Sequence, residues 1–171
     1  LDDNEFFYMT KAIASEGKPV NWGKKIVLDK HSSGGTAGNR TTMIIVPIIA
    51  AAGFCIPKTS SRAITSASGT ADVMEVLAKV SFPVSKIKEI VNKTNGCMVW
   101  GGTLDLANAD DRLIKIEKTL SLDPEGALLS SVLSKKKAVG ATHVLIDIPY
   151  GEGAKINDKN KAKRLKKQFI K

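Results

Sequence analysis

The sequence predicts an α/β protein with a mostly parallel or mixed sheet and helices on both of its faces. The chain has 171 residues, of which 43% are hydrophobic and 25% are charged, and this composition suffices for one sizeable core. Short apolar runs typical of buried strands alternate with longer helical patterns. Such alternation favours parallel strands joined by helical crossovers.

A helix is expected at the beginning of the chain. Asp2 or Asp3 can cap its N-terminus, and Gly17 can end it. Its apolar residues fall at roughly helical spacing: Phe6, Phe7, Met9 and Ile13. A linker containing Pro19, Asn21 and Gly23 follows.

The remaining elements alternate along the chain. Strands are expected at 26–28, 54–56, 97–100 and 142–148. Helices are expected at 39–52, 70–79, 84–93, 110–117, 123–139 and 157–170. Pro47 should kink the helix that contains it, and Asp123-Pro124-Glu125 has the cap, proline and early acid of a helix start.

The net charge of +9 is concentrated in one segment. Residues 155–171 hold eight of the 26 basic residues and one of the 17 acidic residues, so no basic stripe covers the whole fold. We therefore do not expect a nucleic-acid partner. In the last helix, Leu165, Phe169 and Ile170 are expected to pack inward while the lysines form a solvated face.

The cysteines and apolar runs indicate the cellular setting. Cys55 and Cys97 are isolated, with no CxxC spacing, which favours a reducing cytoplasm. The longest apolar run, 43–54, contains Pro47 and is shorter than the roughly 20 residues needed to cross a bilayer. We expect no membrane association, and no cluster has the spacing of a zinc site.

A glycine-rich segment follows the first expected strand, from Lys30 to Gly38. Glycines before a helix let the backbone approach an anion, while Ser32, Ser33 and Thr36 offer hydroxyl donors and Lys30 adds charge. The lysine precedes the glycines, so the pattern is neither a Walker A loop nor a dinucleotide fingerprint. By spacing alone, both a phosphate-binding loop and an ordinary tight turn remain open.

A second polar loop, 58–69, also ends at a helix N-terminus. By itself it is compatible with a solvated connection. Ligands of open α/β sheets bind where loops leave the carboxyl ends of strands, so the two loops can face one crevice. Together they offer places for two phosphate groups.

Three segments resemble the signatures of the thymidine and pyrimidine-nucleoside phosphorylase family. They are Asp29-Lys30-His31-Ser32-x-Gly34-Gly35, Lys58-Thr59-Ser60-Ser61-Arg62 with Gly69-Thr70, and Ser131-x-x-x-Lys135-Lys136. Their order and spacing match across nearly the whole chain. The segments 38–42, 61–66 and 120–126 are most similar to the archaeal-type AMP phosphorylase branch.

The resemblance implies a division of the chain and a reaction. Residues 1–23 resemble the end of an α-helical part, and 24–171 resemble part of a phosphate- and nucleotide-binding α/β domain, so the chain is similar to the central portion of longer enzymes. The implied reaction is phosphorolysis of a nucleoside 5′-monophosphate, in which AMP and phosphate give adenine and ribose 1,5-bisphosphate. The implied partners are AMP or another nucleoside monophosphate and phosphate, with no cofactor, in a homo-oligomer.

The resemblance also assigns residues. The implied phosphate ligands are Lys30, Ser32, Ser60 and Thr70. The implied nucleotide ligands are Gly35, Ser61, Arg62, Ala63, Ile64, Thr65, Ser66, Thr70, Ser131, Lys135 and Lys155. Asp123 resembles the proton donor to the base, and His31 lies within the phosphate loop.

Ordinary structural roles compete with these assignments. Asp123 stands where a helix cap belongs, and capping alone explains an Asp before Pro. Ser131 and Lys135 lie four residues apart, a spacing also typical of a solvated helix face. A noncatalytic phosphate-, nucleotide- or polyanion-binding module is therefore the alternative function.

One departure from the family bears on the substrate. In nucleoside-specific members an arginine that holds the pyrimidine stands fifteen residues before the serine matched by Ser131. Ile116 occupies that place here. This departure favours a nucleoside monophosphate over a pyrimidine nucleoside.

Overall fold

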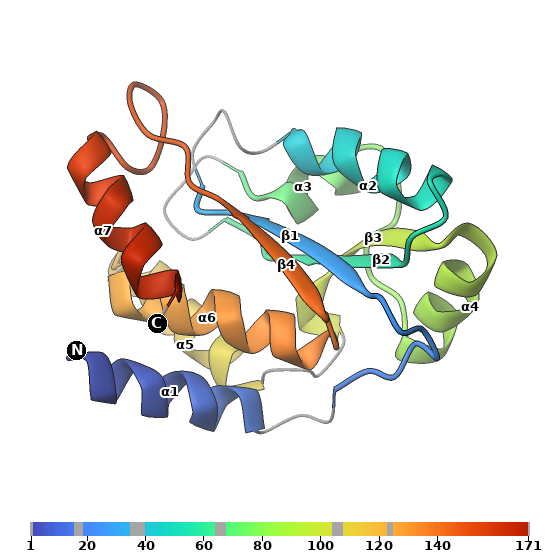
Figure 1. The fold of residues 1–171 in the computed structure, drawn as a ribbon, viewed down its shortest axis with the longest axis horizontal. Coiled ribbons are helices and arrows are strands. Elements are labelled where there is room, and N and C mark those ends of the chain that lie inside the picture. The colour runs from blue at the N-terminus through green and yellow to red at the C-terminus, as the bar shows by residue number, and fades with distance from the viewer. Residues whose placement is uncertain are drawn as a thin grey trace.

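The computed structural model describes residues 2–15, 19–34, 40–63, 68–103, 108–122 and 125–170. Its helices are α1 (Asp3–Ser15), α2 (Thr41–Ala51), α3 (Thr70–Glu75), α4 (Val84–Thr94), the 3-10 helix η2 (Gly101–Thr103), α5 (Asn108–Leu120), α6 (Glu125–Ala138) and α7 (Lys159–Ile170). Its strands are β1 (Leu28–Ser32), β2 (Ile56–Ser60), β3 (Gly96–Trp100) and β4 (His143–Asp147). Figure 1 shows them within an α/β fold, as predicted.

The strands form two parallel pairs. β1 pairs with β4, with Ser32 opposite Asp147 at their carboxyl ends. β2 pairs with β3, with Ser60 opposite Trp100 at theirs. A parallel bridge between Val27 and Cys55 joins the two pairs, which gives the order β4-β1-β2-β3.

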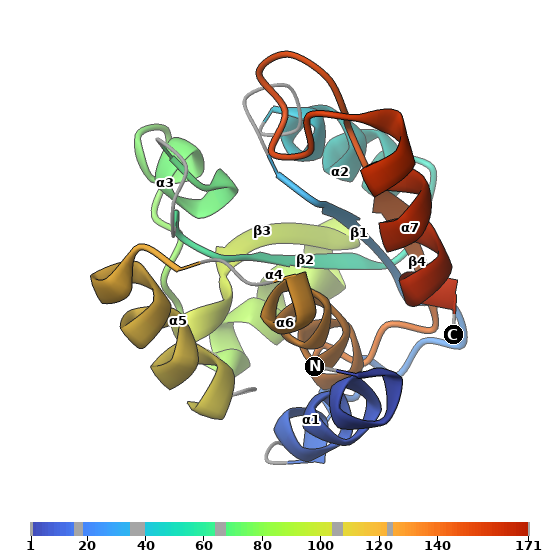
Figure 2. The same cartoon turned by 90° about the vertical axis from the view of Figure 1, so that its left-hand side faces the viewer.

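Helices lie on both sides of the strands. α2 and α3 lie on one side, and α6 lies on the other with α1 beyond it (Figures 1 and 2). The main core contains residues from the strands, from α4, from the end of α6 and from the segment before β1: Val20, Trp22, Val27, Cys55, Ile87, Val91, Cys97, Val99, Ala138 and Val139. Trp22 fixes that segment because its indole N–H donates to the carbonyl of Val139 at 2.7 Å.

Asp2 caps α1, as predicted. Its carboxylate accepts hydrogen bonds from the backbone N–H groups of Asn4 and Glu5, both at 2.8 Å. The Glu5 carboxylate accepts in return from the Asp2 N–H at 2.8 Å, which completes a capping box. The helix then packs along α6, where the Thr10 hydroxyl donates to the Ser130 hydroxyl at 3.2 Å.

The first two strands lie further along the chain than predicted. The strand expected at 26–28 is β1 at 28–32, and the strand expected at 54–56 is β2 at 56–60. The prediction that residues 30–32 and 58–60 belong to loops is therefore wrong. Their polar side chains interrupt the apolar pattern, and burial is possible because ion pairs supply the missing partners.

Helix boundaries also differ from the prediction. α3 ends at Glu75 rather than 79, whereas α5 extends on both sides of the expected 110–117. Leu165 is buried and Phe169 packs against the same cluster, as expected. Ile170 is 73% exposed, because five residues of helix carry it about 140° around the axis from Leu165.

Candidate anion and nucleotide site

Several predicted ligands meet at the carboxyl ends of the parallel strands. Lys30 and Ser32 lie on β1, and Ser60 is the last residue of β2. Asp147 ends β4 directly opposite Ser32. Parallel register places these ends at one edge, where ligands of α/β sheets bind. We call Lys30, Ser32, Ser33 and Ser60 the anion seat.

Lys30 brings a buried and incompletely neutralised charge to the anion seat. Only 3% of the residue is exposed. Its Nζ lies 3.7 Å from the Asp147 carboxylate and has no hydrogen-bond partner in the described ranges of the chain. Burial lowers the pKa of Lys30, and the charge of Asp147 opposes that shift. A buried ammonium that is only partly neutralised is stabilised when an anion binds beside it.

Two serine hydroxyls that follow Lys30 in the chain are also buried. The Oγ atoms of Ser32 and Ser33 have no hydrogen-bond partner within the part of the chain that the structure describes, while the Ser33 N–H donates to the Asp147 carbonyl at 2.8 Å. Buried hydroxyls normally find a partner, so these two exceptions indicate a place for a ligand. A phosphate oxygen can accept from such a hydroxyl.

Gly34 lies beside Lys155. Its φ of +110° is strained for any other residue. A Cβ at this position would lie 3.4 Å from Cδ of Lys155, whose N–H donates to the Gly34 carbonyl at 3.5 Å. Lys155, predicted as a nucleotide ligand, thus contacts the first glycine of the glycine-rich segment.

Asp29 connects β1 to β2 and α6. Its carboxylate lies 2.7 Å from Nζ of Lys136 and 4.0 Å from Nζ of Lys58. The Lys58 ammonium donates to the Thr59 carbonyl and to the Ser60 hydroxyl, the latter at 3.4 Å. All three charged residues are at most 4% exposed. A continuous buried network therefore reaches Ser60.

The lysines perturb one another and a neighbouring histidine. Burial and the charge of Lys136 lower the pKa of Lys58 to about 7, against the opposing effect of Asp29. Burial, followed by the charges of Lys136 and Lys58, holds the pKa of His31 well below its usual value. His31 is therefore a neutral imidazole, able to donate or accept a hydrogen bond.

The second loop is tied to the helix that follows it. Arg62 forms a two-point contact with Glu75 at 2.5 and 2.9 Å, reaches Asp72 at 3.0 Å, and lies 4.9 Å from the centre of the Trp100 ring. Asp72 also accepts from the N–H groups of Ala63 and Gly69, both at 2.8 Å.

These contacts set the pKa of Asp72 and pair the charge of Arg62. Burial raises the pKa of Asp72, but hydrogen bonds from Gly69, Ala63 and Arg62 outweigh it and hold the pKa below its ordinary value. The charge of Arg62 is thus already paired with α3. Thr70 begins α3. It follows Gly69, whose N–H donates to the Asp72 carboxylate.

Ser131 and Lys135 share one face of α6, as predicted. The Lys135 ammonium donates to the Ser131 hydroxyl at 3.1 Å and pairs with the Asp110 carboxylate of α5 at 2.8 Å. The Asp110 side chain is 2% exposed and that of Lys135 is 13% exposed. The face is therefore a buried polar connection between two helices rather than a solvated surface.

Other predicted ligands lie outside the described residues: Gly35, Ile64, Thr65, Ser66 and the proposed proton donor Asp123. Among the described residues, Lys30, Ser32 and Ser60 lie at the strand ends, and Ser61, Arg62, Ala63 and Thr70 lie on the segment that follows β2. Ser131 and Lys135 lie on α6.

Sequence reasoning assigned no role to five charged residues that organise the site: Asp29, Lys58, Asp110, Lys136 and Asp147. Two of them carry a recognisable signal, since Asp29 and Lys58 each follow a short apolar run directly or after one proline. Charges so close to buried strand residues need partners. Nothing in the local sequence identifies those partners.

Metal-binding clusters and membrane-spanning helices are both absent from the described residues. Across the described ranges, no three His, Cys, Asp or Glu residues are grouped so as to hold a metal ion. No helix in those ranges combines the length and apolar character needed to cross a membrane.

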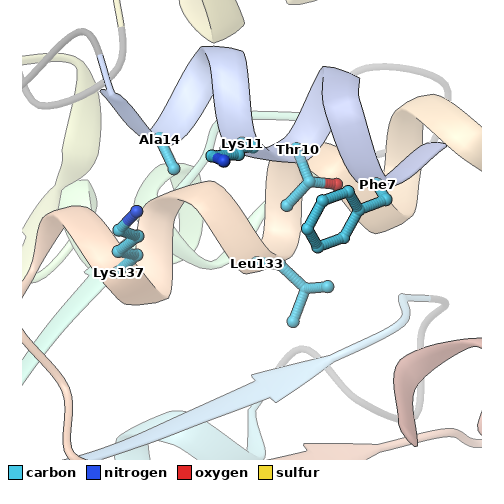
Figure 3. Close-up of a pocket in the computed structure, with 6 residues that line it drawn as sticks. All are labelled: Phe7, Thr10, Lys11, Ala14, Leu133 and Lys137. Atoms are coloured by element: carbon cyan, nitrogen blue, oxygen red, sulfur yellow. The ribbon is translucent and has the colours of Figure 1, made fainter. Parts of the chain in front are cut away.

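A pocket of about 390 Å³ lies between α1 and α6 and is lined by Phe7, Thr10, Lys11, Ala14, Leu133 and Lys137 (Figure 3). None of these six residues belongs to a strand. The pocket is therefore not part of the anion seat.

Comparison with known proteins supports the resemblance drawn from the motifs. AMP phosphorylase of Thermococcus sibiricus is 54% identical over 170 residues, covering 99% of this chain and 34% of that protein. A putative thymidine phosphorylase of Polaromonas sp. is 54% identical over 156 residues, covering 91% and 30%. AMP phosphorylase of Natronomonas pharaonis is 51% identical over 161 residues, covering 94% and 32%. The chain thus spans about a third of the length of these relatives.

A solved structure is similar in fold. Anthranilate phosphoribosyltransferase from Thermus thermophilus superposes with a TM-score of 0.68 at 20% identity, covering 85% of this chain and 44% of that one. The model of the glycosyl transferase family, a/b domain, matches residues 24–159. Since that match takes in most of the sequence, the chain belongs to the glycosyl transferase family represented by this α/β domain.

Proposed function

We propose that this chain forms the phosphate- and nucleotide-binding part of a phosphorylase that acts on a nucleoside 5′-monophosphate. The reaction converts AMP and phosphate into adenine and ribose 1,5-bisphosphate. The observation that carries the proposal is the anion seat, where a buried ammonium and two buried hydroxyls have no hydrogen-bond partner among the described residues at the carboxyl ends of parallel strands.

The anion seat suits an attacking phosphate. Lys30, Ser32, Ser60 and Thr70 hold the phosphate and aim one of its oxygens at the anomeric carbon of the ribose. A bond forms between that oxygen and carbon as the bond from carbon to the base breaks. Asp123 gives a proton to the departing base, which then leaves as a neutral molecule. Phosphate is itself a substrate, so the reaction needs no cofactor.

Three features support a monophosphate as the second substrate. Lys155 lies beside Gly34, close enough to the phosphate loop to bind a further anionic group. Ile116 occupies the place of the family's pyrimidine-binding arginine and is 56% exposed on α5. Relatives named AMP phosphorylase are 51% to 54% identical. The relative named putative thymidine phosphorylase is equally similar, so identity alone does not select the base.

Two observations support the proposed division of the chain. We assign residues 1–23 to the end of an α-helical part and 24–171 to the α/β domain. The family match begins at residue 24. α1 leaves Phe7 57% exposed and Tyr8 66% exposed, a surface that further helices can cover.

The decisive experiment is base release by the natural polypeptide that contains this chain. With AMP, we expect adenine to appear only when inorganic phosphate is present, together with a ribose carrying two phosphates. Thymidine and uridine should be much poorer substrates. Release of thymine at a comparable rate would overturn the choice of AMP while keeping phosphorolysis.

A noncatalytic module is the competing function. It predicts no base release with any nucleoside or nucleotide, although phosphate or a polyanion still binds. Binding of a polyanion through the lysines of α7 should weaken steeply as salt is raised. Binding to the anion seat should instead respond to Ser32→Ala.

A further inference from the structure

The Asp29 carboxylate is fully buried and contacts lysines from two other elements. Lys136 comes from α6 and Lys58 from β2, and the side chains of both are 4% exposed. Lys58 in turn donates to the hydroxyl of Ser60. A single carboxylate thus fixes two ammonium groups and, through one of them, a residue of the anion seat.

We propose that Asp29 is a positioning residue for phosphate, which holds the ammonium groups of Lys58 and Lys136 in place behind the anion seat. The inference deepens the proposed function and rests on it. Asp29 does not itself contact the phosphate, since a carboxylate repels an anion. It acts through Lys58, whose ammonium orients the Ser60 hydroxyl and adds positive charge beneath the bound oxyanion.

The charge balance of the interior supports this role. When Lys30, Lys58 and Lys136 are all protonated, they contribute three buried positive charges, against one buried carboxylate at Asp29 and a second, at Asp147, whose side chain is 35% exposed. Burial alone favours the neutral form of a lysine. Asp29 opposes this effect at Lys58, and one positive charge remains for an incoming anion.

Groups from every neighbouring element contribute to this balance. They are Lys30 and His31 on β1, Lys58 on β2, Asp110 on α5, Lys135 and Lys136 on α6, and Asp147 on β4. His31 is neutral, so its titration lies below the working range. Above neutral pH, loss of the Lys58 proton should therefore weaken anion binding.

The test is Asp29→Asn in the natural polypeptide that contains this chain, assayed with saturating AMP and varied phosphate. Removing the carboxylate lowers the pKa of Lys58 further. We expect KM for phosphate to rise about fivefold at pH 7 and about tenfold well above it, the effect of lowering the pKa of Lys58 by about one unit from its value of about 7. The value of kcat at saturating phosphate should change less than about threefold, since the proton donor is untouched.

The pH profile separates positioning from a merely structural role. Sulfate is the probe here, because its charge is constant across this range. Its inhibition constant in the wild type should rise as pH rises through the pKa of Lys58. In Asp29→Asn that rise should begin about one pH unit lower. Asp29→Glu, which keeps the charge, should restore most of the wild-type profile.

Glu89→Gln is the matched control. Glu89 also pairs with two lysines, Lys86 at 2.9 Å and Lys93 at 3.0 Å, but on the exposed surface of α4. This variant should keep the wild-type KM and profile. If Asp29→Asn does not fold, Lys58→Met replaces it, and we expect the same rise in KM for phosphate.

Each outcome has a distinct meaning. A folded Asp29→Asn variant with wild-type KM and an unshifted sulfate profile overturns the positioning role and leaves the proposed function intact. If kcat and the affinity for phosphate fall only as far as the fraction of folded protein falls, and the sulfate profile is unshifted, then Asp29 has only a structural role. A wild-type protein that neither binds phosphate nor releases base with it overturns the proposed function itself.

Discussion

Lys135 on α6 lies 2.8 Å from the buried carboxylate of Asp110 on α5 and 3.1 Å from the hydroxyl of Ser131. The two residues predicted to contact the nucleotide are thus held in place by a third. Because the ammonium has three donors, it retains capacity for a ligand while making both contacts.

Asp110→Asn should therefore affect both stability and the site. Leaving Lys135 without its carboxylate partner in a largely buried position should lower the free energy of unfolding by about 3 kcal/mol. Urea unfolding measures this change. The exposed pair variant Glu89→Gln should cost less than about 1 kcal/mol. A smaller loss for Asp110→Asn than for Glu89→Gln would contradict the buried connection.

Asp72 should matter more than Arg62 for the second loop. Asp72 binds the N–H groups of Ala63 and Gly69 as well as Arg62, so removing its charge weakens all three contacts, whereas removing Arg62 leaves the two backbone contacts in place. We expect Asp72→Asn to weaken AMP binding more than Arg62→Met does, measured by isothermal titration. A larger loss for Arg62→Met would indicate that Arg62 contacts the nucleotide directly.

Gly69→Ala should be poorly tolerated. A Cβ at Gly69 would lie 2.6 Å from the Ser61 carbonyl oxygen, and backbone atoms cannot yield as a flexible side chain can. We expect a loss of about 2 kcal/mol in unfolding free energy, within the range for overpacking. Gly101→Ala is the control, since its nearest contact is an ordinary 3.7 Å. Equal melting temperatures for the two variants would refute the close approach.

Lys58 should make stability depend on pH in the absence of anions. Its pKa is about 7 in the fold, below the ordinary lysine value of 10.5, so the unfolded chain binds more protons between these limits. The free energy of unfolding should therefore gain a rising contribution as pH increases from about 7 to 10.5. Lys58→Met should lose that contribution when unfolding is followed across this range. A slope identical to the wild type would disprove the lowered pKa.

Asp123→Asn tests the proposed chemistry. Phosphorolysis should fall by about two to four orders of magnitude, the usual contribution of a general acid, with AMP binding retained. Steady-state kinetics and equilibrium binding measure the two effects separately. Near-normal turnover would leave Asp123 with the role of a helix cap.

The local apolar pattern predicts a strand accurately where the apolar residues coincide with the paired residues, and less accurately where charged residues lie inside the strand. β3 and β4 were predicted within about one residue, because their apolar runs coincide with the paired residues. β1 and β2 lie further along the chain than predicted, because Asp29, Lys30 and Lys58 interrupt the apolar pattern inside the strands. The motifs predicted the phosphate loop, yet the motifs alone did not indicate that Lys58 supports Ser60.

The sequence by itself determined the alternation of strands and helices, the position of the glycine-rich segment after β1 and the family, since each depends on patterns that are read along the chain. Only the tertiary structure decided which charges are buried and with which partners. Asp29 and Lys136 are 107 positions apart, and their ion pair exists because α6 packs against the strands. Burial then makes that pair strong and sets the pKa of Lys58, a property of the assembled interior that no segment carries alone.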